Sequence, residues 1–228
     1  MLDFLDGIVN FFSIAINFAP KFLPGVLMTL ELSILSIIFG TVFGVFVTLA
    51  KMSKIKPLRG LANLYVAVIR GTPLLLQLFF VFYGLPQLGV TLDSFPTAVL
   101  GLALHNAAYI SEIFRGSIQA IDLGQTEAAQ ALGMTKLQAF RTVIFPQAFK
   151  NAVPALGNQF LLAIKDSSLA STITIAETLM KARQYAAATY SIFPIYFDAA
   201  VYYMLMTYVL ALLLKMLEKR LRINERKV

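Results

Sequence analysis

Long apolar runs separated by short polar segments dominate this chain of 228 residues. A window of about 20 apolar residues is long enough to cross the hydrocarbon core of a bilayer as a helix. Five such windows occur, at residues 23–50, 58–85, 96–116, 146–164 and 192–217. The pattern therefore predicts an all-α integral membrane protein, with one core of five transmembrane helices over residues 23–217.

The first 22 residues predict an amphipathic helix that lies at the membrane interface and does not cross it. Apolar side chains recur at helical spacing, and acidic and amide side chains fall largely on the opposite face. The two sets are Leu2, Leu5, Val9, Phe12, Ile16 and Asp3, Asp6, Asn10, Ser13, Asn17. Because Asp3 and Asp6 stand where a signal peptide has basic residues, we expect no secretory signal.

Composition agrees with a membrane protein and excludes several classes of site. Hydrophobic residues make up 58% of the chain, charged residues 14%, and the mean hydropathy is +0.76. With no cysteine and a single histidine, His105, the chain has no disulfide framework, thiol nucleophile or ordinary zinc site. It also lacks the Gly-x4-Gly-Lys-Ser/Thr motif that cradles nucleotide phosphates.

The net charge of +7 is explained by membrane orientation. Of the 19 Lys and Arg residues, 14 fall in three segments: residues 51–59, residues 115–150 and the tail from Lys215. The five-span interpretation puts all three on one face, which the positive-inside rule makes cytoplasmic. We therefore expect an outside N-terminus, a basic cytoplasmic tail at residues 218–228, contact with anionic lipid and no nucleic-acid partner.

A hydrophilic segment, residues 122–145, interrupts the apolar pattern with a predicted helix–Gly–helix element. Its residues are typical of an N-cap, a left-handed C′ position, a capping box and a helix stop. They are Thr126, Gly133, Thr135 with Gln138, and Pro146, which ends the second helix at about Phe145. Such a water-facing element in a membrane protein predicts a docking site for a soluble partner.

Ionisable groups inside the predicted spans are costly and should face the bundle interior or a cavity. Asp198, about six residues into the last span, is suited to receive a cationic ligand; the alternative is a structural pair with Lys165 or Arg70. Arg70 precedes Gly71-Thr72-Pro73, which predicts a helix break near mid-membrane. It is suited to a ligand carboxylate or a gate, or else pairs with Glu112 or Glu31.

Further polar side chains lie in the third and fourth spans. We expect His105 to be an interhelical hydrogen-bond donor in preference to a proton relay, and Asn106 to line a cavity beside Tyr109, which shares its helix face. An i,i+3 pair of Glu112 with Arg115 is preferred over ligand contact. Asn158 is a further polar candidate, and Lys165 either receives a carboxylate at the outer mouth, snorkels or pairs with Asp166.

Small residues mark one helix–helix contact. Gly40, Gly44 and Thr48 recur every four residues on the first span and predict close approach of another helix of the same chain.

The motifs resemble those of ABC-importer permease subunits of the polar amino acid uptake family. The coupling loop of that family is matched by Glu127, Ala128, Ala129, Gly133, Ile144 and Pro146, and further matches are residues 70–77, 108–116, 124–125 and 146–148. Residues 165–169 depart slightly, because Ser167 stands where the family more often has Thr. The resemblance covers roughly residues 25–215.

This resemblance implies a prokaryotic inner-membrane protein with partners. The first partner is an ABC ATPase, present in two copies, which binds the ATP and Mg and docks on Glu127, Ala128, Ala129 and Gly133. The second is another permease subunit, identical or paralogous. The third is an extracytoplasmic amino-acid-binding protein. The chain itself would be no enzyme and hold no cofactor.

We therefore expect import of polar amino acids by alternating access. Asp198 narrows the expectation to cationic ones, with Arg70, Asn106, Tyr109, Glu112, Asn158 and Lys165 as the other substrate-binding candidates. Two alternatives are an ion-coupled secondary amino acid transporter that acts without an ATPase, with Asp198 and His105 as its proton relay, and a non-transporting membrane scaffold.

Overall fold

The structure, a computed structural model, describes residues 2–221, with side chains described from Asp6 onward. Every regular element in that range is helical, as predicted. The α-helices are α1 Leu2–Phe18, α2 Leu23–Met52, α3 Lys56–Gly71, α4 Leu74–Phe79, α5 Leu85–Gln87, α6 Ser94–Gln119, α7 Leu123–Ala131, α8 Lys136–Ala139, α9 Phe145–Asp166, α10 Thr178–Thr189 and α11 Ile192–Arg220. Short 3₁₀ segments are Ala19–Phe22 and Ser167–Ile173, and π-helical segments are Phe80–Gly84 and Phe140–Ile144.

Two helical stretches in the described range are long and apolar enough to cross a membrane, namely Asp6–Met52 and Ile192–Arg220. A third arises if the bent pair Lys56–Gly71 and Leu74–Gln87 counts as one span. The helices α6 and α9 are 26 and 22 residues long but carry more polar groups. The count of five spans stays a prediction, as does an interfacial position for α1. Most of the predicted basic tail lies outside the described residues.

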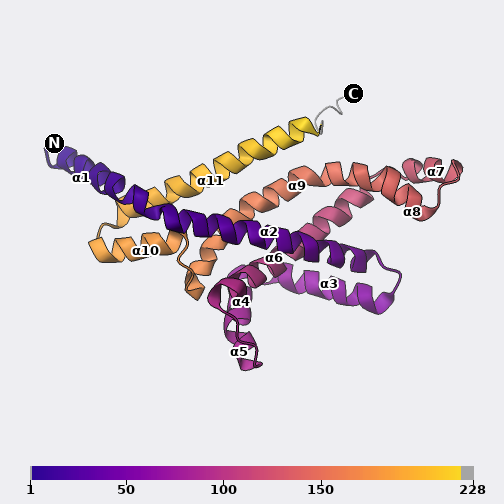
Figure 1. Ribbon diagram of the computed structural model, residues 1–228, viewed down its shortest axis with the longest axis horizontal. Coiled ribbons are helices and arrows are strands. Elements are labelled where there is room, and N and C mark those ends of the chain that lie inside the picture. Colours follow the sequence, from indigo (N-terminus) through magenta and orange to yellow (C-terminus); the bar gives the residue numbers. More distant parts are fainter. Residues whose placement is uncertain (1, 222–228) are drawn as a thin grey trace.

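The N-terminal helix α1 is not detached from the core. Phe11 lies against the start of α11, with ring centroids 5.1 Å from Phe193 and 5.3 Å from Phe197. Ala15, one turn further along α1, is buried. In Figure 1, α1 and the beginning of α11 accordingly meet at one end of the molecule, next to α10.

Helix α6 lies at the centre of the bundle, and its closest neighbour is α2. A Cβ added at Gly40 would lie 2.8 Å from Cβ of Asn106, and one at Gly44 would lie 2.9 Å from Cγ2 of Ile110. Thr48, the third small residue, donates from its hydroxyl to the carbonyl of Ser111 at 3.1 Å. The predicted small-residue contact within the chain is confirmed.

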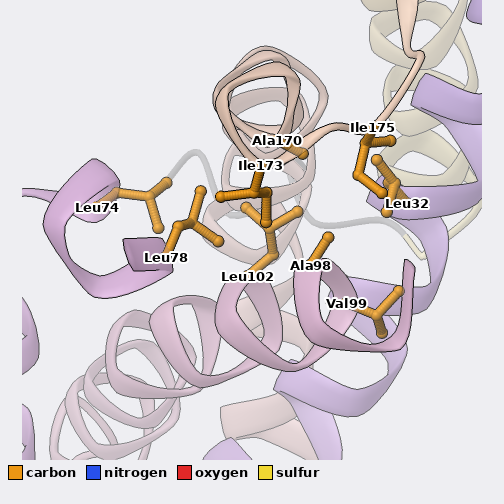
Figure 2. Packing of buried hydrophobic residues seen from close by; sticks show 9 residues of the cluster. All are labelled: Leu32, Leu74, Leu78, Ala98, Val99, Leu102, Ala170, Ile173 and Ile175. Carbon is orange, nitrogen blue, oxygen red and sulfur yellow. The ribbon is translucent and has the colours of Figure 1, made fainter. Parts of the chain in front are cut away.

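An apolar cluster fixes the short helix α4 against α6. Leu74 and Leu78 of α4 are buried against Leu102 of α6 and against Ile173 of the 3₁₀ segment that follows α9 (Figure 2). Burial of such side chains contributes roughly 1.5–3 kcal/mol each. The chain after the helix break is thus held in place by packing on two other elements.

Glu177 joins α10 to α2 and α11. Its fully buried carboxylate caps α10, accepting from the backbone N–H groups of Leu179 at 2.8 Å and Met180 at 2.7 Å. The hydroxyls of Thr29 on α2 and Tyr203 on α11 also donate to it. Burial raises the pKa of Glu177, and these hydrogen bonds oppose the rise.

Candidate functional site

The hydrophilic segment, residues 122–145, folds as α7, a tight turn and α8. The N-cap of α7 is Asp122, whose Oδ1 accepts from the N–H of Gly124 at 2.6 Å. The prediction of Thr126 as the N-cap is wrong, because α7 begins at Leu123 and Thr126 lies inside it. Asp122 is the stronger cap because a carboxylate also interacts favourably with the positive end of the helix dipole.

The turn between the two helices has the predicted geometry. Gly133 is left-handed, with φ of +80°, and the N–H of Met134 donates to the carbonyl of Ala129 at 3.1 Å to close the end of α7. Thr135 and Gln138 form the capping box of α8 in both directions, with a 2.8 Å bond from the Thr135 N–H to the Gln138 side chain. The two helices are therefore rigidly connected.

The second helix does not end before Pro146, contrary to prediction. It continues from α8 through the π-helical segment Phe140–Ile144 into α9, which contains Pro146 in its first turn. The N–H of Phe145 bonds to the carbonyl of Phe140, five residues back. The wider turn accommodates a proline ring that would clash in a regular α-helix. As a result, the second helix of the hydrophilic segment, α8, continues directly into α9 (Figure 1).

Most of this segment is open to a partner. Glu127 and Ala128 are exposed, whereas Ala129 is on the buried side of α7. Leu123 is 78% exposed and Leu132 80% exposed, so both side chains are accessible to a partner. Beside them lies a groove of about 480 Å³ whose lining includes Ile118, Ile121, Leu123, Thr126, Gln130, Lys136 and Phe140.

A second polar region surrounds the predicted helix break. Helix α3 ends at Gly71, and the chain turns by 112° into the arm Leu74–Gln87. Arg70, the last charged residue before the turn, keeps 49% of its side chain exposed. Its guanidinium lies 5.4 Å from the ring centroid of Tyr109 and 4.0 Å from the Glu112 carboxylate.

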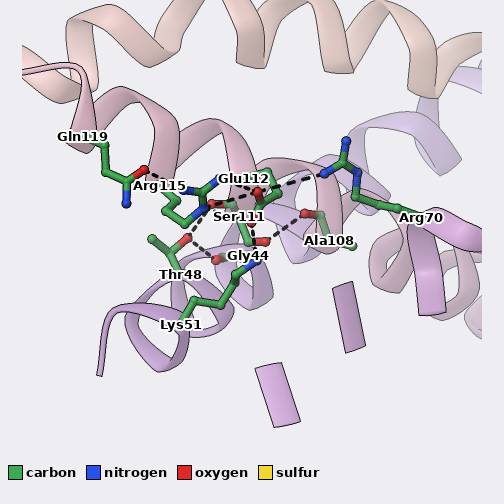
Figure 3. Close-up of polar contacts among 9 residues, drawn as sticks. All are labelled: Gly44, Thr48, Lys51, Arg70, Ala108, Ser111, Glu112, Arg115 and Gln119. Carbon is green, nitrogen blue, oxygen red and sulfur yellow. Dashed lines mark hydrogen bonds and ion pairs between the residues drawn. The ribbon is translucent and has the colours of Figure 1, made fainter. Parts of the chain in front are cut away.

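Glu112 is held mainly by two other cations (Figure 3). Arg115 donates to it at 2.7 Å, which confirms the expected i,i+3 pair, and Lys51 at the end of α2 donates as well. Because these two contacts are closer than the 4.0 Å to Arg70, the Glu112 charge is compensated without Arg70. The Arg70 guanidinium is thus available to a further anion.

Asn106 is not a cavity-lining residue in this structure, which corrects the prediction. It is 1% exposed, and its Oδ1 accepts from Nε2 of Gln159 on α9 at 2.8 Å. Its amide nitrogen lies 3.4 Å from the hydroxyl of Ser36 on α2. Asn106 therefore links three helices and has no face toward solvent.

Helix α9 carries an exposed polar stripe. Asn151, Asn158 and Lys165 recur every seven residues, lie on one helix face and are all exposed. Within the described residues Lys165 forms no ion pair, so of the three alternatives for this residue the pair with Asp166 is not observed. Exposed amides and a cation on a membrane helix fit an aqueous or protein-facing side and not a lipid-facing one.

Asp198 stands apart from these groups. It is 6% exposed, and its Oδ2 has no hydrogen-bond partner in the described chain. The alternative of a structural pair with Lys165 or Arg70 is not observed. Its neighbours Ile195 and Ala199 belong to the apolar cluster that α10 and α11 form with α2 and α9. A carboxylate left without a partner in such surroundings is the least satisfied polar group of the described structure.

The structure thus brings Arg70, Tyr109 and Glu112 together, places Asn158 and Lys165 on the exposed face of α9, and leaves Asp198 separate. Sequence reasoning assigned no role to Glu177 and no partner to Lys51, Gln77 or Gln159. Gln77 could have been singled out, because it follows the Pro73 break by four residues and a break leaves carbonyl groups that need donors.

The family model, the relatives and the solved structure that match this chain all belong to transport systems. Residues 40–223 match the family model described as binding-protein-dependent transport system inner membrane component. The chain is 45% identical over 206 residues, 90% of its length and 88% of the relative's, to the L-cystine transport system permease protein TcyB of Bacillus subtilis (strain 168). It is 40% identical to the arginine transport system permease protein ArtQ of the same organism, covering 94% of this chain and 98% of that one.

A solved structure, the crystal structure of an amino acid ABC transporter with histidines, aligns with a TM-score of 0.87 and 43% identity. The alignment covers 92% of this chain and 98% of that chain.

Proposed function

We propose a substrate class and a transport route on the premise that the chain belongs to the family of binding-protein-dependent transport system inner membrane components, as a permease subunit of an amino acid ABC importer. As such it is a multi-pass protein of the inner membrane and a transport component, not an enzyme; the ATPase is a separate subunit. The family also implies a second permease and a substrate-binding protein as partners.

The proposed substrate is a polar amino acid with a cationic side chain: arginine, lysine or histidine. The observation that carries this proposal is the buried, unpartnered carboxylate of Asp198. A guanidinium, ammonium or imidazolium would supply the missing hydrogen-bond donors and charge. Two relatives support it, since one is an arginine permease and another was solved with histidines. The cystine permease at 45% identity makes cystine the main competitor.

The carboxylate of the substrate would be received by Lys165 at the outer mouth and then by Arg70 at the helix break. Both are exposed, and Glu112 does not need Arg70 for its charge balance, because Lys51 and Arg115 already pair with it. The Tyr109 ring, over which the Arg70 guanidinium lies, would support that guanidinium. Asn158 would form hydrogen bonds with the amino or carboxylate group of the substrate as it passes. Together with Lys165, Asn158 makes the face of α9 that we assign to the transport route.

The coupling segment, as we now call residues 122–145, would dock in the partner ATPase. Two ATPase copies, which bind the ATP and Mg, would engage the coupling segments of two permease subunits. Because α8 continues into α9, a movement of the segment would be transmitted to the proposed route without an intervening flexible loop. In this arrangement the N-terminus is outside, the C-terminus is cytoplasmic, and the apolar faces of α2 and α11 contact lipid.

The substrate proposal is tested by uptake into proteoliposomes that contain the chain, its ATPase and its binding protein. Radiolabelled arginine, histidine and cystine are compared for the unmodified chain, for Asp198→Asn and for Asp93→Asn, a control at an exposed carboxylate. We expect Asp198→Asn to reduce arginine and histidine uptake about tenfold or more, the factor that corresponds to about 1.4 kcal/mol. Preferred uptake of cystine, or unchanged arginine uptake by Asp198→Asn, would contradict it.

A further inference from the structure

The helix break before α4 leaves backbone carbonyls that helix geometry cannot satisfy. Thr72 and Pro73 are both extended, with ψ of 148° and 137°, so the carbonyls of the last turn of α3 have no following N–H groups to accept from. The Thr72 hydroxyl donates to the carbonyl of Val68 at 2.8 Å. The next carbonyl, that of the partly buried Ile69, requires a donor from elsewhere, since unpaired carbonyls are costly in a membrane.

Gln77 supplies that donor from the other side of the bend. Its side-chain nitrogen lies 2.7 Å from the carbonyl of Ile69 and 3.0 Å from the carbonyl of Thr72. It also lies 3.0 Å from the Thr72 hydroxyl. Because Ile69 belongs to α3 and Gln77 to α4, this one amide joins the two arms and fixes the angle between them.

The orientation of the Gln77 amide determines which nitrogen of the neighbouring His105 ring carries a hydrogen. Two carbonyl oxygens can only accept, so the NH₂ group must face them and Oε1 must point the other way. Oε1 lies 3.0 Å from Nδ1 of His105 on α6. An amide oxygen also only accepts, and therefore Nδ1 of His105 carries a hydrogen. His105 thus makes an interhelical hydrogen bond, and the orientation of Gln77 makes His105 the donor, as expected.

The face of α6 that carries His105 also carries the two residues that contact Arg70 of α3. His105, Tyr109 and Glu112 are spaced four and three residues apart and share this face. The His105 ring packs on Tyr109 with centroids 4.9 Å apart, Tyr109 supports the Arg70 guanidinium, and Glu112 lies 4.0 Å from it. Arg70 itself precedes the break by one residue, so the position of its backbone depends on how the break is held.

We propose that Gln77 and His105 are positioning residues that brace the break and thereby aim Arg70 at the transport route. Gln77 closes the bend, and the Nδ1–H of His105 fixes Gln77 to α6. Both side chains are buried, at 7% and 9% exposure, so they act through the break and not by contact with a substrate. The role in transport rests on the proposed contact of Arg70 with the substrate carboxylate, but the brace itself does not.

The brace is tested by a distance measurement that needs no transport. The chain has no cysteine, so Leu61→Cys on α3 and Leu88→Cys after α5, both exposed positions, give one spin-label pair across the bend of each copy of the chain. The permease–ATPase complex in nanodiscs is measured with Gln77→Glu, His105→Asn and His105→Phe. His105→Asn keeps an N–H near the position of Nδ1, whereas His105→Phe keeps only an aromatic ring. Gln77→Glu replaces the donating NH₂ group with an oxygen.

We expect a narrow distance distribution for the parent pair and for His105→Asn, and a shifted or broadened one for Gln77→Glu and His105→Phe. An unchanged distribution in the last two variants would overturn the brace. So would the reverse order, in which Phe preserves the distribution and Asn does not, because ring packing alone would then explain His105.

Uptake kinetics separate the brace from the proposed role of Arg70. We expect Gln77→Glu to raise the KM for the amino acid about tenfold, and to have no further effect in an Arg70→Ala background, because coupled sites are not additive. Additive effects would overturn positioning through Arg70. If the distances respond as expected while Arg70→Ala leaves uptake unchanged, the brace stands and the proposed contact of Arg70 with substrate falls.

Discussion

Arg115 donates to the Glu112 carboxylate at 2.7 Å, one turn away on α6, while Arg70 reaches the same carboxylate only at 4.0 Å. The two arginines therefore have different tasks. Arg115, with Lys51, balances a charge inside the bundle, and Arg70 presents a half-exposed guanidinium at the helix break.

This difference predicts that substitution of Arg115 lowers stability and that substitution of Arg70 lowers transport. Arg115→Ala leaves Glu112 with only part of its partners and should lower the thermal midpoint of the purified complex, by an amount that corresponds to about 1–3 kcal/mol. Arg70→Ala should leave that midpoint within experimental error and lower uptake. Thermal unfolding in detergent and proteoliposome uptake measure the two effects. A destabilised Arg70→Ala together with an undisturbed Arg115→Ala would contradict the assignment.

The close contact of α2 with α6 predicts a steric effect at Gly44. A Cβ there would lie 2.9 Å from the Ile110 side chain and 3.1 Å from the carbonyl of Ala107. Gly44→Val should therefore separate the helices and cost about 1–3 kcal/mol, as overpacking does. Gly60→Val is the control, since nothing lies within 4 Å of a Cβ at that position. Equal unfolding midpoints for the two variants would show that the contact is not tight.

The turn of the coupling segment predicts a loss of coupling without loss of the membrane fold. Gly133 has φ of +80°, which a β-branched residue adopts only with strain of about 1–3 kcal/mol. Gly133→Val should reorient α8 relative to α7 and weaken co-purification of the ATPase, while the midpoint of the membrane core stays the same. Gly116→Val, at an exposed helical position, is the control. Undiminished ATPase binding by Gly133→Val would argue against a role for this turn.

The buried Glu177 predicts a pH dependence of stability. Burial raises its pKa in the folded chain above the ordinary value near 4.5, so the folded state favours the protonated form relative to the unfolded state. The resulting stabilisation is present below the unfolded pKa and is lost as the pH rises through the folded pKa. Glu177→Gln should therefore lose less stability than the parent when the pH is raised from 4 to 8. Parallel midpoint-against-pH curves would show that Glu177 does not titrate in this way.

The sequence predicted the elements whose signals are local. Apolar length identified α2 and α11, small-residue spacing identified the contact through Gly40 and Gly44, and the Thr135–Gln138 box and left-handed Gly133 needed only neighbouring residues. These features depend on a few positions along one helix. They could therefore be derived before any tertiary structure was known.

The errors arose where two elements compete or meet. Pro146 is normally a helix stop, but the π-helical turn before it relieves the clash, and no local pattern distinguishes the two outcomes. Thr126 and Asp122 are both residue types that cap helix N-termini, and in the structure Asp122 is the N-cap of α7. Asn106 was assigned to a cavity because its partner, Gln159, lies 53 residues away and the register of α9 against α6 is not encoded in either helix alone. Gln77 differs, because the carbonyls that it satisfies, those of Ile69 and Thr72, lie only eight and five residues away and the Pro73 break is a local signal.

Coupling to ATP hydrolysis is the central claim about this chain. The most direct test is ATP-dependent arginine uptake in proteoliposomes that contain the chain, its ATPase and its binding protein, with and without Glu127→Lys on the exposed face of α7. We predict that uptake occurs only when ATP is present on the side of the membrane where the ATPase lies. We also predict that Glu127→Lys abolishes uptake although the variant still inserts into the proteoliposome membrane. Uptake that proceeds without ATP or without the ATPase, driven by an ion gradient alone, would contradict the account.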